Sequence, residues 1–168
     1  MKRILAILSL ILAMTLGASA QSLVGTWSAK VTDNESEDGT EVKATGYDRI
    51  TFTETTFSRT MTCNMTVKAD TKESAIDMVV KIKGSISGTW KKVGNIVTLT
   101  PGKKAKPSIS VETENCPALI QALLVGPVKK ELKEELRDED ELEILSISAT
   151  QFVTNDGEGV KTTYNRVK

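Results

Sequence analysis

Apolar and polar residues alternate along much of the chain with a period of two. The longest run covers residues 57–67, and its odd-numbered positions are Phe57, Arg59, Met61, Cys63, Met65 and Val67. Every even-numbered position in this run is Ser, Thr or Asn. Because successive side chains of a strand point to opposite faces, this pattern predicts a strand with one buried face. The same pattern returns at residues 48–53 and 76–83.

Turn-forming residues separate the alternating runs and predict hairpins. Gly94-Asn95 and Asn155-Asp156-Gly157 each lie between two such runs, and residues of these types adopt the conformations that join antiparallel strands. Residues 50–57 and 145–152 both consist of a strand pattern, a three-residue corner and a Phe, so we expect them to form equivalent hairpins. The whole pattern predicts a mainly β fold with about eight strands in an up-and-down antiparallel order.

One section, near residues 117–137, has helical periodicity and predicts a helical insertion between strands. A short helix is expected from Pro117 to Leu124, with Asn115 as its N-cap. Gly126-Pro127 is expected to interrupt it. A second helical stretch follows, with a narrow apolar stripe at Val128, Leu132 and Leu136. The charged residues around this stripe, and the acidic run that continues to Glu141, are interpreted as solvent-exposed.

The first 20 residues have the three-part organisation of a secretory signal peptide. Lys2 and Arg3 form a basic start, residues 4–16 are almost wholly apolar, and Ala18-Ser19-Ala20 offers small residues for cleavage. We expect cleavage after Ala20, which leaves one domain over residues 21–168 in the periplasm or outside the cell. The apolar run is shorter than the roughly 20 residues that a membrane-spanning helix needs, so no transmembrane segment is expected after cleavage.

The chain has two cysteines, Cys63 and Cys116. In an exported protein a pair of cysteines favours a disulfide, which we predict between these two residues. The alternative is a pair of buried thiols that never meet, because spacing along the chain does not show that the two Cα atoms approach each other.

Composition argues against most enzymatic functions and against nucleic-acid binding. Lys and Arg together number 22, as do Asp and Glu, so the chain has no basic surplus for nucleic acid or an anionic membrane. The chain has no His, which excludes the usual Ser-His and Cys-His nucleophiles and removes the commonest transition-metal ligand. We expect a non-enzymatic protein without a metal or cofactor.

Arg59 is the one charged residue on the apolar face of its strand, beside Met61 and Met65. A charge that faces the interior of a β fold is costly unless it is paired. One interpretation is a ligand site in which Arg59 binds a carboxylate or phosphate between the adaptable side chains of Met61 and Met65. The alternatives are an Arg whose head reaches water at the strand end, or one that pairs with an internal acid.

Gly25-Thr26-Trp27 opens the first expected strand, and Tyr164-Asn165-Arg166 closes the last one. A Gly-x-Trp at this place, with an Arg near the end of a β-rich exported domain, resembles the lipocalin signature. The resemblance is greatest to the small lipocalin-like domains of bacteria, and it covers residues 22–168. A second Gly-Thr-Trp, residues 88–90, is interpreted as the start of a mid-barrel strand.

The resemblance implies an eight-stranded calycin-type barrel in which Trp27 closes one end and Arg166 lies across the indole ring. Both residues would be structural. Barrels of about eight strands have interiors just wide enough for side chains or for one small ligand. The helical insertion near 117–137 departs from the family's usual order, in which the main helix follows the last strand.

Two functional hypotheses follow from these features. The first is a non-enzymatic exported protein that binds a small apolar or amphipathic ligand in the barrel, with Arg59, Met61 and Met65 in the site. The second is an envelope-associated interaction module or inhibitor, whose filled barrel presents loops or the insertion to a protein partner. Few residues are aromatic, which makes a large lipid cavity less favourable.

Overall fold

A computed structural model describes residues 22–37, 40–70, 75–103, 105–155 and 160–168. The chain forms the elements β1 (Gly25–Glu37), β2 (Thr40–Phe52), β3 (Thr56–Asp70), β4 (Ala75–Val93), β5 (Ile96–Pro101), β6 (Ser108–Glu114), α2 (Ala118–Glu135), β7 (Asp140–Ile147), β8 (Gln151–Asn155) and β9 (Lys161–Arg166). No helix within these ranges is long and apolar enough to cross a membrane.

Eight of the strands form the barrel that the alternation pattern predicts. Each pairs antiparallel with the next in the order β1, β2, β3, β4, β5, β7, β8 and β9. β9 then pairs with β1 and closes the barrel. β6 adds to β4 outside this cycle, so β6 and α2 form an insertion between β5 and β7. The predicted fold and its helical insertion are confirmed.

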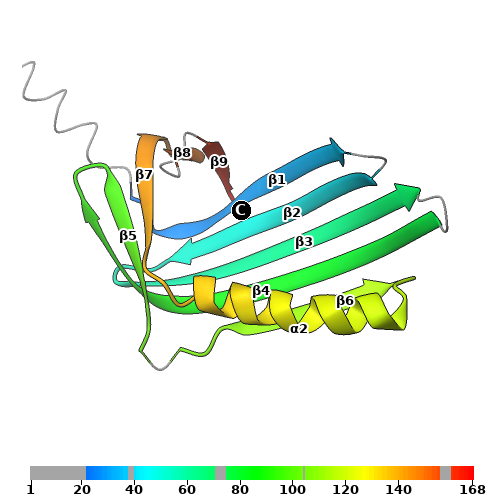
Figure 1. Ribbon diagram of the computed structural model, residues 1–168. Helices are drawn as coiled ribbons and strands as arrows, with labels where there is room; N and C mark the ends of the chain where they lie inside the picture. Colours follow the sequence, from blue (N-terminus) through cyan, green and yellow to red (C-terminus); the bar gives the residue numbers. More distant parts are fainter. Residues whose placement is uncertain (1–21, 38–39, 71–74, 104, 156–159) are drawn as a thin grey trace, which may run out of the picture.

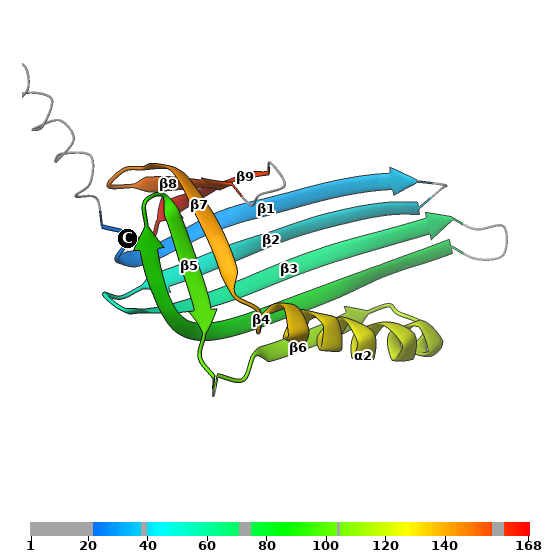
Figure 2. The same ribbon diagram turned by 60° about the vertical axis from the view of Figure 1, so that its left-hand side comes forward.

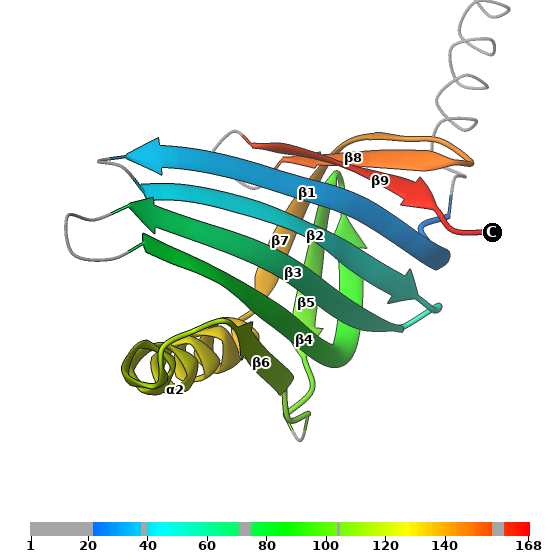
Figure 3. The same ribbon diagram turned by 90° about the vertical axis from the view of Figure 1, so that its right-hand side faces the viewer.

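The barrel strands differ greatly in length, and this inequality shapes the molecule. β1 to β4 contain 13, 13, 15 and 19 residues, whereas β5, β8 and β9 contain 6, 5 and 6. The long strands therefore run past the short ones as an open curved sheet, which we call the extension (Figures 1 and 3). The end of the barrel opposite the extension is the closed end, and the end from which the extension continues is the mouth.

α2 lies beside β6, near β4 and the extension (Figure 3). It is one helix that continues through Pro127, so the predicted interruption is wrong. Pro127 removes the hydrogen bond that would reach the Leu123 carbonyl, but both residues are exposed and water can solvate that carbonyl. Asn115 is not the N-cap either: Pro117 occupies that position, and Asn115 adopts a left-handed conformation with φ of 55°.

The two corners predicted to be equivalent have the same hydrogen bonds. In the β2–β3 corner the Thr53 N–H donates to the Thr56 carbonyl at 2.8 Å, and the Thr56 N–H donates to the Thr53 hydroxyl at 3.0 Å. In the β7–β8 corner Ser148 and Gln151 make the matching bonds at 2.7 and 2.9 Å. A side-chain oxygen thus replaces a backbone acceptor in both turns, and this confirms the predicted equivalence.

The closed end is filled by large apolar side chains. Those with the smallest exposure are Trp27, Phe52, Phe152, Ile50, Leu99 and Val97. The Trp27 indole N–H donates to the Leu23 carbonyl at 2.6 Å, and its ring meets the edge of Phe152 at a centroid distance of 5.0 Å. This end of the barrel therefore has a packed core that leaves the ligand space to the mouth.

Arg166 covers Trp27 in the way that the lipocalin resemblance implies. Its guanidinium carbon lies 4.2 Å from the indole centroid, and its amino groups donate to the Val24 and Ser22 carbonyls at 3.2 and 3.1 Å. The backbone at residue 25 explains why the motif begins with glycine. Its φ is 130°, and an added Cβ would lie 2.8 Å from Arg166 Nη1. The positive φ requires glycine, and the missing Cβ leaves room for the Arg166 guanidinium.

The second Gly-Thr-Trp, residues 88–90, lies near the end of β4 and does not begin a strand, so this prediction is wrong. Here Gly88 allows close strand packing, because an added Cβ would lie 2.1 Å from the Thr100 carbonyl oxygen. Trp90 packs edge-on against Phe52 at 5.1 Å and donates to the Thr53 carbonyl at 3.0 Å. The motif therefore recurs for a different local reason.

Cys63 on β3 and Cys116 after β6 are both free thiols, so the predicted disulfide is wrong. β4 lies between these strands, since Glu114 pairs with Val79 and Val79 pairs with Thr66. Two strand spacings separate positions on β3 and β6 by about 10 Å, before the offset along the strands is counted. A disulfide needs Cα atoms closer than about 7 Å.

Candidate ligand-binding site

A group of buried polar side chains lies at the mouth, directly above the apolar core. β2 contributes Asp48, which shares a face with the buried Ile50 and Phe52. β3 contributes Arg59, which pairs across the sheet with Ile50. Because the polar residues follow the core residues along the same face, the strand pattern itself places a charged layer where the barrel opens.

Arg59 and Asp48 form a forked ion pair. Arg59 Nε donates to the two carboxylate oxygens of Asp48 at 3.1 and 3.0 Å, and Nη2 donates to Oδ2 at 2.8 Å. The Tyr164 hydroxyl on β9 donates to the same Oδ2 at 2.6 Å. Asp48 is only 6% exposed, so its negative charge depends on these donors for the stabilisation that water would otherwise provide.

Asp140 extends this network across the barrel. It begins β7, directly after the segment that follows α2, and accepts a hydrogen bond from Arg59 Nη1 at 2.6 Å. Its side chain is 44% exposed, whereas that of Arg59 is 19% exposed. The bridge between Arg59 and Asp140 therefore ties the long β3 to the short side of the barrel at the level where solvent enters.

The surroundings of Arg59 and Tyr164 hold both side chains in their protonated forms. Burial acts to lower the pKa of Arg59, but the hydrogen bonds and charge of Asp48 outweigh it and raise that pKa above its ordinary value. Burial is the largest cause that raises the pKa of Tyr164, and the charge of Asp48 adds to it. Arg59 thus remains a cation, and Tyr164 remains a hydrogen-bond donor.

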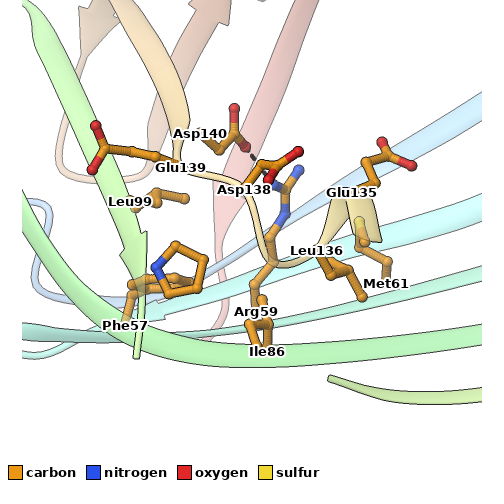
Figure 4. A pocket seen from close by; sticks show the side chains of 11 residues that line it. Phe57, Arg59, Met61, Ile86, Leu99, Glu135, Leu136, Asp138, Glu139 and Asp140 are labelled. Atoms are coloured by element: carbon orange, nitrogen blue, oxygen red, sulfur yellow. Dashed lines mark hydrogen bonds and ion pairs between the residues drawn. The ribbon is translucent and has the colours of Figure 1, made fainter. Parts of the chain in front are cut away.

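Two cavities flank the bridge between Arg59 and Asp140. The smaller, of about 260 Å³, lies toward α2 and has apolar walls from Phe57, Ile86, Leu99 and Leu136. The larger, of about 350 Å³, lies between the long strands and β7 to β9, with walls that include Val31, Ala44, Cys63, Leu142 and Thr162. Arg59, Met61 and Asp140 line both cavities. In Figure 4 Arg59 points from β3 toward Asp140, with Met61 and Leu136 to one side.

The cavities have an acidic lining. Among the described residues, Arg59 is the only basic one that lines either of them. The acidic lining residues are Asp33, Asp48, Glu135, Asp138, Glu139, Asp140 and Glu141. Since Arg59 already pairs with two carboxylates, the excess negative charge disfavours an anionic ligand at this position. In the described part of the chain, no group of three or more His, Cys, Asp or Glu is arranged to hold a metal ion.

The structure brings Arg59 and Met61 together at the cavities but places Met65 elsewhere. Met65 lies further along the same face of β3, on the extension, and it lines neither cavity. Of the interpretations that the sequence left open for Arg59, pairing with an internal acid is the one found. The carboxylate of Asp140 contradicts the expectation that the acidic run up to Glu141 is only a solvent-exposed surface.

Asp48, Asp140 and Tyr164 belong to the site but were not predicted from the sequence. A signal existed for Asp48, because it has the same parity as Ile50 and Phe52 and is therefore an acid on an apolar face. No comparable signal exists for Asp140, whose neighbours are all charged and which meets Arg59 only because β7 crosses the mouth. Cys63 also lines the larger cavity, and burial raises the pKa of its thiol.

Comparison with known families gives one match, to a lipocalin-like domain over residues 23–116. This segment is more than half of the chain. The chain belongs to the lipocalin-like domain family. Lipocalin-like proteins are generally binding proteins without enzymatic activity, and their barrel suggests small-molecule binding. The matched segment contains Trp27, Asp48 and Arg59 but ends before β7, so their partners Asp140, Tyr164 and Arg166 lie outside it. No curated protein matches the chain.

Proposed function

We propose that this lipocalin-like protein is a non-enzymatic exported protein that binds one small amphipathic molecule at the barrel mouth. The observation that supports this most is the pair of cavities, each with apolar and acidic walls, that meet at the bridge between Arg59 and Asp140. The larger cavity, at about 350 Å³, falls within the range of roughly 300–1,000 Å³ that is typical of small-molecule sites. The packed closed end keeps the ligand at the mouth.

The ligand's apolar part is proposed to occupy the larger cavity, against Met61, Ala44 and Leu142. Its polar group is proposed to lie near Asp140, the network member with the most exposed side chain. Because the acidic lining outnumbers the single Arg59, the polar group should be uncharged or cationic. A carboxylate or phosphate would have to displace Asp48 or Asp140 from Arg59.

Matched amphiphiles test the ligand class. Octylamine, octanol and octanoate share one apolar chain and differ in the charge of the head group. Isothermal titration calorimetry is expected to show binding of the amine and the alcohol and weaker or no binding of octanoate. Tighter binding of octanoate would contradict the charge argument, and no binding of any of the three would contradict the cavity proposal.

Met61 and Met65 offer a matched pair of variants for the same titration. Met61→Gln introduces a polar amide into both cavities, so it is expected to weaken amphiphile binding by about tenfold. Met65→Gln makes the same chemical change on the same face of β3, outside both cavities, and should leave binding unchanged. Equal losses in the two variants would place the ligand on the extension.

Export is proposed from residues 1–20, which lie outside the described residues. The measurement is the N-terminal sequence of the protein from its own host, after separation of cytoplasm, periplasm and medium. A mature N-terminus at Gln21 in the periplasm or medium is expected. Full-length protein confined to the cytoplasm would contradict export.

A second candidate is an interaction module of the cell envelope, and α2 is the feature that favours it. Leu119 and Leu123, one helical turn apart, are 74% and 69% exposed. A photo-crosslinking amino acid at position 119 tests this candidate in the host. One reproducible cross-linked protein that disappears when the amino acid is moved to position 129 would favour this candidate. The absence of any cross-linked protein would contradict it.

A further inference from the structure

β1 has a strand neighbour on both sides only at its beginning. It pairs with β2 along its whole length, from Gly25 to Glu37. It pairs with β9 only through Trp27 and Ser28. Within the described part of the chain, residues 29–37 thus have a hydrogen-bonded strand on one side alone, and Figure 2 shows the far end of β1 at the margin of the long sheet.

The pairing also determines which backbone groups point to the open side. The Val167 N–H donates to the Thr26 carbonyl at 2.8 Å, so Thr26 points its backbone groups away from β2. Because these directions alternate along a strand, the other even-numbered residues of β1 point the same way. The N–H and carbonyl groups of Lys30, Thr32, Asn34 and Ser36 therefore face the open side.

This open edge lacks two of the features that normally prevent strand addition, a proline and a bulge, but it carries inward charges at Asp33 and Glu35. Residues 30–36 are all exposed. They contain no proline, and their register with β2 runs without a bulge. Natural sheets protect such edges with bulges, prolines, inward charges or covering segments. Here the side chains on the inner face are Val31, Asp33 and Glu35, and the first two also line the larger cavity.

We propose that residues 30–36 of β1 form a peptide-binding edge, to which an extended segment of another protein adds as an antiparallel strand. Backbone hydrogen bonds would supply affinity, and alternate side chains would supply specificity, as in other cases of strand addition. Charge complementarity defines the partner: Lys or Arg opposite Asp33 and Glu35, and an apolar residue opposite Val31. A second copy of the chain fits less well, because it would bring another acidic edge to the same face.

This site differs from the small-molecule site because it uses the backbone of β1 and not the network around Arg59, although Val31 and Asp33 also line the larger cavity. The probe is a fluorescent seven-residue peptide, Thr-Lys-Thr-Lys-Thr-Val-Thr, added to the full chain and followed by fluorescence anisotropy. A peptide with Glu in place of both Lys residues is the charge control. We expect the Glu peptide to bind about tenfold more weakly, since it places like charges opposite Asp33 and Glu35.

Backbone methylation separates strand addition from simple charge attraction. In an antiparallel pair, residues that exchange hydrogen bonds lie opposite each other with their side chains on the same face. The side chains of the open-side residues of β1 point outward, so the probe residues opposite them also have outward side chains. When the Lys side chains face inward, these are the Thr residues, and the Thr backbone N–H groups donate to β1. N-methylation of Thr should abolish binding, whereas N-methylation of Lys should leave it nearly unchanged. Equal binding of both methylated peptides would overturn the proposal.

Variants of β1 provide the matching test on the protein. Asp33→Asn with Glu35→Gln is expected to weaken binding of the Lys peptide by about tenfold. Asp77→Asn, an exposed acid on β4, should leave it unchanged and serves as the control. Hydrogen exchange gives a second measurement: the amides of Lys30, Thr32, Asn34 and Ser36 should exchange fast in the free protein and slowly with the peptide.

Three further outcomes would overturn this assignment. The first is unchanged exchange at the four open-side amides with the peptide bound. The second is equal affinity of the parent and the Asp33 and Glu35 double variant for the Lys peptide. The third is a concentration-dependent dimer, detected by sedimentation, whose formation protects the same four amides, because a second copy would then be the occupant. Loss of amphiphile binding would leave all these measurements unaffected.

Discussion

Two arginines mark the two ends of the barrel, and their surroundings differ. Arg166 lies outside the closed end, over the Trp27 ring, and its other contacts are with backbone carbonyls. Arg59 lies inside the mouth and contacts carboxylates of Asp48 and Asp140. Arg166 covers a packed apolar core from outside. Arg59 is largely shielded from water, so its charge needs the internal carboxylates as partners. This barrel is therefore closed by apolar packing at one end, whereas at the other end an ion-pair network crosses the mouth beside the cavities.

The largest effect is expected from removing the charge of Asp48. Asp48→Asn leaves Arg59 buried with only the half-exposed Asp140 as its ionic partner, and breaking a buried pair in this way costs about 3–5 kcal/mol. The measurement is the free energy of unfolding in urea. The double variant Asp48→Leu with Arg59→Met should recover much of this loss, because no buried charge then lacks its partner. A loss below about 1 kcal/mol for Asp48→Asn would show that water reaches the network.

Tyr164→Phe removes one donor from the same carboxylate and should have the next largest effect. A hydrogen bond to a charged group contributes about 1.5–3 kcal/mol, so the free energy of unfolding should fall by roughly 2 kcal/mol. Tyr47→Phe is the matched control, because Tyr47 is 54% exposed. Equal effects of the two substitutions would mean that the Tyr164 hydroxyl does not stabilise Asp48.

High pH should lower the stability of the folded protein through the ionisation of Tyr164. Its pKa is raised in the folded protein, so above the ordinary tyrosine value, near pH 10, the unfolded chain releases this proton while the folded chain keeps it. Stability from this group is complete below about pH 10 and declines above it by up to about 1.4 kcal/mol per pH unit.

Tyr47→Phe makes this pH dependence visible, because Tyr164 is then the only tyrosine. The tyrosinate absorbance of this variant should appear together with unfolding, followed by circular dichroism. Tyrosinate formation near pH 10 in a still folded protein would contradict the prediction.

Arg166→Met tests the closed end and should have a smaller effect than the changes at the mouth. It removes the contact with Trp27, worth about 0.5–2 kcal/mol, while the Val24 and Ser22 carbonyls can turn to water. We expect the free energy of unfolding to fall by about 1 kcal/mol, with amphiphile binding unchanged. A loss as large as that of Asp48→Asn would remove the proposed contrast between the two ends.

A reducing agent should leave the mass of the protein unchanged, because Cys63 and Cys116 are free thiols. The denatured mass should be the same with and without reductant, and thiol titration of the unfolded chain should give both cysteines. A mass increase of two hydrogens on reduction would show that the two residues are bridged. Alkylation of Cys63, which lines the larger cavity, is expected to be slow, because burial raises the pKa of its thiol.

Much of the fold could be predicted because it depends on local patterns. The alternation at residues 57–67 and the two matching corners specify strands and turns without reference to distant residues. Part of the site could also be predicted, since Arg59 was conspicuous as a charge on an apolar face. Its partners were harder to find: Asp140 is 81 positions away in the chain and sits in a run of acids. Only the closure of the barrel distinguishes it from its neighbours.

The β class, the hairpin order and the role of Gly-Thr-Trp at the start of the barrel could be predicted, because they depend on periodicity and on the conformations that single residues allow. The pairing of Arg59, the position of Met65 outside the cavities and the separation of Cys63 from Cys116 became visible only in the folded chain. The same is true of the residues of β1 that lack a hydrogen-bonded neighbour on one side. The physical reason is that each of these depends on which strands become neighbours, and on where the long strands outrun the short ones.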